Sequence, residues 1–235
     1  MFWEKQKDPS KETPEGCAHA LYGYFFASLR DKSGRIRVEE LINAAASIAG
    51  ERCIEAAGDF NPREHTMTPG SRVFSDKANK LLCGDRGDES IATVPPDSAF
   101  GMLRDKLVPG KYTLEDFPPI KSIFQYFAAN IGKKEDWGKV PLSVPKDNQP
   151  YLLPLRVAYE TRGKVDQLFE PLGRDAVMKF QAAVFALAEA LKAVAGAIEK
   201  KIGLSLALET VNGMAKTAPM TDAAMAEAAK KSQTG

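Results

Sequence analysis

The chain has 235 residues, enough for one large domain or two small ones, and its 44% hydrophobic and 27% charged residues are typical of a globular protein. The 32 Lys and Arg nearly cancel the 31 Asp and Glu, which leaves a net charge of +1. This balance lacks the excess of positive charge that is typical of nucleic-acid-binding proteins, so no nucleic-acid partner is expected. Three widely spaced cysteines, Cys17, Cys53 and Cys83, favour reduced thiols in the cytoplasm over a disulfide framework.

The first predicted helix begins at residue 14. Residues 1–13 are polar and carry several charges, so we expect a flexible tail and no secretory signal. Thr13-Pro14-Glu15 then supplies a capping hydroxyl, a proline suited to the first helical position and an acid at the positive end of the helix dipole. Apolar residues recur with helical spacing as far as Leu29, and Gly34 favours a turn after them.

A second helix is predicted over about residues 37–57. Because only a short glycine-containing turn separates it from the first, an antiparallel helical hairpin is expected. Its apolar positions define the face predicted to be buried: Val38, Leu41, Ile42, Ala45, Ile48, Ala49 and Ala56. Four charged residues of this helix are expected on its outer face: Glu39, Glu40, Glu51 and Arg52.

The middle of the chain is predicted to consist of long loops and short helices. Residues 58–75 contain two prolines and two glycines without periodicity, which indicates a structured loop. Short helices are predicted at about 76–83, with Ser75 as the cap, and at 98–107 and 119–131, with a short extended run at 91–94.

Residues 138–154 contain four prolines, which predict an extended segment. This segment is a possible sub-boundary within a single mainly helical domain of residues 14–217. A helix interrupted by Gly163 is expected at about 155–169. The remaining residues, 218–235, are predicted to form a weakly helical tail capped by Thr221.

The most apolar segment, residues 175–201, is predicted to be a long helix. Seven large apolar residues in it are spaced alternately by three and four, as in a coiled-coil seam: Val177, Phe180, Val184, Leu187, Leu191, Val194 and Ile198. A membrane span is excluded, because Glu189 and Lys192 would lie inside it and each charge at a helix centre costs about 2.5–3.5 kcal/mol. Two alternatives stay open: a central helix of the chain's own bundle, or a seam between copies of the chain. Beyond it, Gly203 or Gly213 is expected to kink or end the helix.

The fold class predicted from these elements is a mainly α, irregular multi-helix bundle. It has a helical hairpin at the N-terminus, long loops in the middle and a long C-terminal helix.

Candidate catalytic residues are concentrated in the irregular region Asp59–Asp88, because loops held on a rigid helical frame often carry sites. His65 is the best-placed general base there, Cys83 is the nearest thiol, and Asp85 is a possible acid. Cys53, His65 and Cys83 are also weak candidates for a metal site if the loop folds back. Zinc ligands usually occur in close pairs, which these residues do not form. The alternative interpretation is that the polar residues of this region cap helices and solvate a loop.

The sequence does not determine whether the protein is an enzyme, and it contains no P-loop, GxGxxG turn, GxSxG elbow or HExxH helix. No cofactor is therefore expected. The first hypothesis is a soluble helical interaction or scaffold protein that self-associates as a homo-oligomer through the seam. The alternative is an enzyme or small-ligand-binding protein with its site in the Asp59–Asp88 region.

Overall fold

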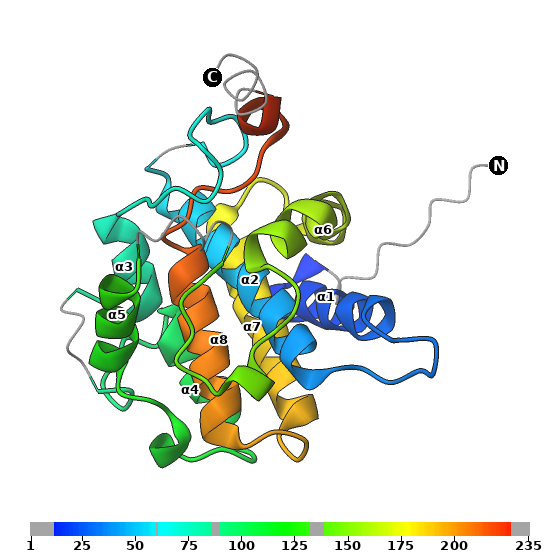
Figure 1. Cartoon of the computed structure of the whole chain (residues 1–235), viewed down its shortest axis with the longest axis vertical. Coiled ribbons are helices and arrows are strands. Elements are labelled where there is room, and N and C mark those ends of the chain that lie inside the picture. Colours follow the sequence, from blue (N-terminus) through cyan, green and yellow to red (C-terminus); the bar gives the residue numbers. More distant parts are fainter. Residues whose placement is uncertain (1–11, 60, 86–89, 132–138, 227–235) are drawn as a thin grey trace.

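The computed structural model describes residues 12–59, 61–85, 90–131 and 139–226. In this part of the chain the regular structure is helical, apart from one isolated bridge between Arg72 and Thr217, which confirms the predicted mainly α fold (Figure 1). The α-helices are α1 (Pro14–Ser28), α2 (Val38–Ala57), α3 (Asp76–Cys83), α4 (Ala99–Leu107), α5 (Ile120–Ala129), α6 (Pro154–Phe169), α7 (Ala176–Val194) and α8 (Lys200–Met214). Short 3-10 helices occur at Leu114–Asp116, Lys146–Asn148 and Glu170–Leu172.

Helix α2 lies at the centre of the bundle, where it packs against both α7 and α8 (Figure 1). Helix α7 also contacts α1 and α4, whereas α5 packs on α8 and α3 packs on α2 and α4. Helices α1 and α2 contact each other, as expected for neighbours joined by a short turn, but each contacts α7 more extensively. The core is therefore built from helices that are far apart in the sequence.

Helix boundaries follow the capping residues seen in the sequence. The hydroxyl of Thr13 accepts a hydrogen bond from Gly16 N at 3.1 Å, and that of Ser75 accepts one from Ala78 N at 3.0 Å. Such bonds satisfy amide groups that have no partner within the first helical turn. Helix α2 ends at Gly58, which has a φ of 67° in the left-handed region that favours glycine.

The long C-terminal helix predicted over residues 175–201 is divided into two. Helix α7 ends at Val194, whose carbonyl accepts hydrogen bonds from the amides of both Ala197 and Ile198 in the following turn. Gly196 lies in this turn, and glycine is among the least favourable residues in a helix interior. The chain then enters α8, and Gly203 lies inside that helix rather than at its end.

The predicted seam of α7 packs within the chain. Phe180, Val184, Leu187, Leu191 and Val194 are buried. Ile198 is partly buried and Val177 is 45% exposed. Helix α7 is thus a central helix of the chain's own bundle, the first of the two alternatives. Within the described residues, no helix combines the length and apolarity needed to cross a bilayer.

A glycine allows α2 and α8 to approach closely. A Cβ atom at Gly50 would lie 2.4 Å from the Cβ of Met214 and 2.7 Å from the carbonyl oxygen of Val211. Both distances are far below van der Waals contact, and the second atom belongs to the backbone. The spacing of these two helices therefore requires glycine at position 50.

The four charged residues of α2 predicted to face outward are buried, so that prediction was wrong. Arg52 is 1% exposed and forms ion pairs with Glu55 and, at 2.6 Å, with Asp166 on α6. Glu51 is paired with Arg162 on α6 at 2.8 Å. The remaining two, Glu39 and Glu40, both lie beside Arg37. Burial is possible because each charge has a partner, which offsets much of the desolvation cost.

The proline-rich segment lacks α-helix over residues 139–153, here called the strap, but the 3-10 helix Lys146–Asn148 interrupts the predicted extended chain. Of the predicted range, residue 138 lies outside the described residues and Pro154 begins α6. The strap crosses α2 and α8 with its backbone hydrogen-bonded to their buried side chains. Asn43 donates to Leu152 O at 2.9 Å, Glu40 accepts from Leu152 N at 3.2 Å, and Glu209 accepts from Ser143 N at 2.7 Å. Buried side chains before and after the strap belong to one core, so the strap does not separate two cores.

The short extended run predicted at 91–94 is a series of turns instead. Arg104 donates hydrogen bonds to the carbonyls of Ile91, Ala92 and Val94. These bonds satisfy carbonyl groups that would otherwise need a neighbouring strand, which is the physical reason that turns replace the strand.

Candidate functional site

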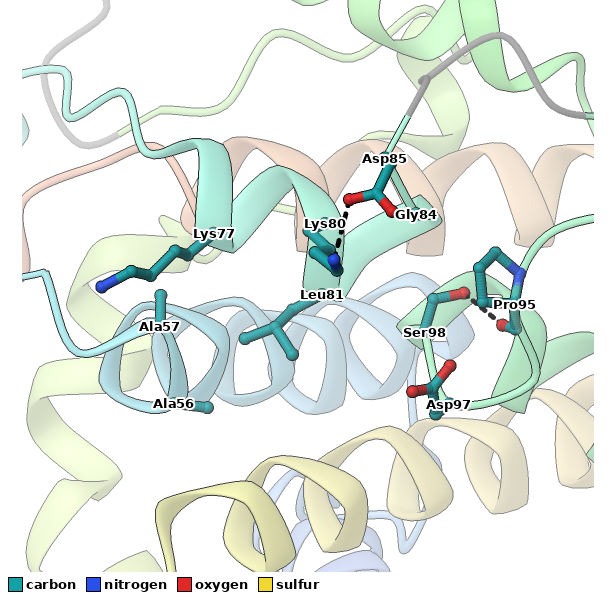
Figure 2. Close-up of a pocket in the computed structure, with 10 residues that line it drawn as sticks. All are labelled: Ala56, Ala57, Lys77, Lys80, Leu81, Gly84, Asp85, Pro95, Asp97 and Ser98. Atoms are coloured by element: carbon teal, nitrogen blue, oxygen red, sulfur yellow. Dashed lines mark hydrogen bonds and ion pairs between the residues drawn. The ribbon is translucent and has the colours of Figure 1, made fainter.

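Two recesses flank α3, and residues of the predicted region Asp59–Asp88 line both. The larger, here called the α3–α5 recess, has a volume of about 710 Å³. Its lining residues are Asp76, Lys77, Asn79, Lys80, Cys83, Gly84, Asp85 and Phe124. The smaller, here called the α3–α4 recess, has a volume of about 260 Å³ and is lined by Ala56, Ala57, Lys77, Lys80, Leu81, Gly84, Asp85, Pro95, Asp97 and Ser98 (Figure 2).

The charged side chains around α3 are largely paired with one another. Figure 2 shows Lys80 directed at Asp85, with 2.9 Å between the amine nitrogen and a carboxylate oxygen. Lys77 forms a similar pair with Asp59, also at 2.9 Å. Ion pairs at such exposed positions contribute little to stability. They leave the mouths of both recesses close to electrical neutrality.

Lys216 lies immediately after α8 and is held there by a loop. Its carbonyl accepts a hydrogen bond from Val73 N at 2.9 Å, and Ala218 N donates to Ser71 O at 2.8 Å. Gly70 N in turn donates to Ala218 O at 2.9 Å. The loop over residues 58–75 is therefore ordered by pairing with the chain beyond α8, and this pairing fixes the position of the Lys216 backbone.

The amine of Lys216 is buried against aromatic rings. The side chain is 4% exposed, and Nζ lies 3.8 Å from the centroid of the Phe124 ring and 5.5 Å from that of Phe127. Nζ also donates a hydrogen bond to Asn212 Oδ1, one turn earlier in the chain. Among the described residues no carboxylate lies within ion-pair distance of this amine. Because Phe124 also lines the α3–α5 recess, the amine lies behind the wall of that recess.

Burial lowers the pKa of Lys216 from its ordinary value of 10.5 to about 8, with the thiols of Cys53 and Cys83 acting in the opposite direction. At pH 7 about 10% of such an amine is neutral, against roughly 0.03% for an ordinary lysine. A neutral amine has a free lone pair, so Lys216 is the residue of this region best suited to nucleophilic chemistry.

Two thiols lie close to this amine, one from α2 and one from α3. Cys53 Sγ donates to Ala78 O at 3.5 Å, and Cys83 Sγ donates to Asn79 O at 3.6 Å. Burial raises the pKa of Cys53, which keeps its thiol protonated. Since the thiolate is the reactive form, Cys53 is not suited to act as a nucleophile at neutral pH.

The residues predicted to form a catalytic or metal site are only partly brought together. Cys53 and Cys83 lie near enough for one to affect the pKa of the other. The imidazole of His65 instead lies near the backbone of Met67 and Pro219, and burial lowers its pKa. No group of three or more His, Cys, Asp or Glu residues within the described ranges is arranged to hold a metal ion. The set Cys53, His65 and Cys83 therefore does not form the weakly predicted metal site.

Asp85, the third catalytic candidate, lies at the mouth of the α3–α5 recess and is paired with Lys80. His65 is absent from the lining of that recess, whereas Cys83 is part of it. The structure thus brings Cys83 and Asp85 to one recess without the predicted base.

The sequence analysis missed Lys216 and Asn212, whereas Asn79 lies inside the predicted region Asp59–Asp88. Asn79 Oδ1 and Asn212 Nδ2 are buried and make no hydrogen bond within the described part of the chain. Buried polar atoms in proteins nearly always have a partner, so such atoms mark places where polar contacts remain to be made. The feature of the sequence that could have indicated this pair is the i, i+4 spacing of Asn212 and Lys216 at the end of a strongly apolar helix.

Comparisons of the chain with protein-family models, with curated proteins and with solved structures found no match. The geometry of the recess and of the groups around it is therefore the basis of the functional argument.

Proposed function

We propose that this protein binds a small molecule in the α3–α5 recess. The observation that carries the proposal is a recess of about 710 Å³ whose lining includes Asn79, a residue with a buried Oδ1 that makes no hydrogen bond within the described part of the chain. Ligand sites in proteins commonly have volumes of about 300–1,000 Å³ and a few well-placed polar groups. This proposal corresponds to the second hypothesis from the sequence, with Phe124 of α5 added to the predicted region.

The lining residues favour a small, polar ligand without net charge. Two lysines and two aspartates line the recess, so their formal charges cancel. Phe124 offers an aromatic face, and Asn79 offers an acceptor for a hydroxyl or N–H group of the ligand. A strongly anionic ligand would require unpaired cations, whereas Lys77 and Lys80 are each paired with a carboxylate.

A thermal-shift screen of small neutral polyols, amides, aldehydes and ketones, followed by calorimetric titration of the hits, tests this proposal. Asn79→Ala is expected to weaken binding about tenfold, because one hydrogen bond is worth about 1–1.5 kcal/mol. Asp97→Ala is the matched control, since Asp97 lines only the α3–α4 recess. The proposal is abandoned if no compound raises the melting temperature, or if both variants weaken binding equally.

Self-association is a second and weaker proposal. The predicted seam cannot provide the contact, because most of it is buried in the chain's own core. The observation in favour is an apolar side chain on the surface, Phe74, which is 68% exposed directly before the Ser75 cap of α3. Light scattering of the wild type and of Phe74→Ser over a wide concentration range tests it. A wild type that stays monomeric at high concentration would remove this proposal.

We also propose a cytoplasmic location. Cys17, Cys53 and Cys83 are unbridged and buried, although two of them are close neighbours. Thiols that lie close together are readily oxidised in secretory compartments. Alkylation and mass analysis of protein taken directly from cells would detect three free thiols if this proposal is correct, and a disulfide would contradict it.

A further inference from the structure

We infer that Lys216 forms an imine with the carbonyl carbon of a small hydroxy-aldehyde or hydroxy-ketone that enters the α3–α5 recess. The inference rests on the proposed function, since the ligand is taken to reach the amine from that recess, past Phe124. It adds a chemical class of ligand and a covalent step that binding alone does not require.

The surroundings of Lys216 distinguish it from the other lysines of the site. Lys77 and Lys80 are exposed and lie 2.9 Å from carboxylate oxygens. Lys216 is buried against two rings, and its amine donates to a neutral amide oxygen. Burying a charge without a counter-charge is costly, and an apolar residue of similar length would fill the same space. The two rings offset part of this cost for the ammonium form, but the amine has no counter-charge among the described residues.

Phe124 connects the amine with the recess. Its ring contributes to the recess wall, and the same ring lies over Nζ, with 3.8 Å between the ring centroid and the nitrogen. Phe124 is only partly buried, and side chains of this kind change rotamer rapidly. The inference requires this ring to turn aside and admit the ligand to the amine.

The chemical step needs no oxidant or reductant. The lone pair of the neutral amine attacks the carbonyl carbon and forms the C–N bond. The carbonyl oxygen then leaves as water and takes both hydrogens of the amine, so that atoms and electrons balance. Asn212 Oδ1 accepts one N–H and orients the nitrogen. The unpaired Asn79 Oδ1 can accept a hydrogen bond from the ligand's hydroxyl group.

The groups facing the amine determine its pH response. They are Cys53 from α2, Cys83 from α3, Phe124 and Phe127 from α5, and Asn212 from α8. None of them is a carboxylate, and desolvation is the largest influence on the pKa of Lys216. The rate of imine formation at this residue should rise with pH and level off above about 8, because the amine is then mostly neutral.

Reductive trapping with glycolaldehyde and sodium cyanoborohydride, followed by peptide mapping, tests the inference on the full chain. At pH 7.5 we expect Lys216 to gain the hydroxyethyl group at least about tenfold faster than Lys77 or Lys80, because its neutral fraction is far larger. Phe124→Ala should accelerate the labelling, and urea should abolish the preference. Lys216→Met should abolish hydroxyethyl labelling at position 216. Lys216→Arg is the control that keeps the positive charge but cannot form the imine, so it should also remain unlabelled at this position.

The outcomes separate this inference from the proposed function. If labelling follows exposure, so that Lys77 and Lys80 react faster than Lys216 in the folded protein, the inference is wrong. If a carbonyl compound raises the melting temperature equally in the wild type and in Lys216→Met, the recess binds ligands and only the imine is refuted. If no compound binds and nothing is trapped at Lys216, both fail.

Discussion

Replacement of Lys216 by methionine gives the sharpest test of the buried amine. Methionine fills a similar volume, contacts aromatic rings favourably and carries no charge. The amine is buried against Phe124 and Phe127 without a carboxylate partner among the described residues. At neutral pH the wild type bears the cost of burying this charge, so Lys216→Met should be the more stable protein.

The magnitude follows from the two pKa values of Lys216, 10.5 when exposed and about 8 in the folded protein. Between these values the unfolded chain binds more protons than the folded one, so the wild type gains stability relative to the variant as pH rises. The difference between the two pKa values corresponds to about 3 kcal/mol in the free energy of unfolding. About 2.5 kcal/mol of this stability is gained by the wild type, relative to the variant, between pH 7 and pH 10. The raised pKa of Cys53 acts in the opposite direction in both proteins, and it is raised further in the variant because Lys216 no longer lowers it.

Urea unfolding followed by circular dichroism at pH 7, 8, 9 and 10 measures this effect. The stability advantage of Lys216→Met should be largest at pH 7 and should shrink by about 2.5 kcal/mol by pH 10. Lys77→Met, at an exposed position, controls for the general effect of the substitution. An advantage that does not change with pH would refute the lowered pKa and, with it, the argument for a partly neutral amine.

Three further substitutions test the packing. Arg52→Met removes one of the two arginines that pair with Glu55 and Asp166, while Arg63 still pairs with both, so urea unfolding should show a loss of about 1.5–3 kcal/mol in the free energy of unfolding; no loss would contradict the contribution of the Arg52 pairs. Gly50→Ala should lower the free energy of unfolding by about 2–3 kcal/mol, because the new Cβ meets α8. Gly23→Ala is the control at an exposed position of α1 with open space around it, and it should raise the free energy of unfolding by about 0.5–1 kcal/mol. Equal effects of the two substitutions would contradict the close approach of α2 and α8. Glu40→Ala leaves strap amides without an acceptor, so stability should fall by about 2 kcal/mol and hydrogen exchange at Leu152 should accelerate; unchanged exchange would contradict the anchoring.

The helices were predictable because their signals are local. Thr13, Ser75 and Thr221 cap helices where the sequence indicates, and the apolar spacing of α7 correctly predicted a core face. The break after Val194 was missed because Ala195-Gly196-Ala197 is compatible with both a weak helix and a turn. Tertiary packing of α8 against α2 decides between the two.

The site was less predictable because its parts come from distant segments. The region Asp59–Asp88 includes α3, which lines the α3–α5 recess, and a functional site there stays a prediction. Lys216, however, is unremarkable in sequence, and its lowered pKa arises from burial among side chains of distant segments, such as the rings on α5. Arg52 was placed outside for the same reason, because its partner Asp166 is 114 residues further along the chain. No local pattern carries such information.

The position of the strap has a consequence for how the protein is made. Helix α2 is synthesised before α7 and α8, on which it packs, and the backbone partners of its Glu40 and Asn43 lie in the strap. A nascent chain therefore exposes an apolar helix with unpaired polar groups until the strap, α7 and α8 have been synthesised. The parts of the chain before and after the strap share one hydrophobic core. Two fragments separated at the strap should therefore be insoluble alone and should regain structure only when they are refolded together.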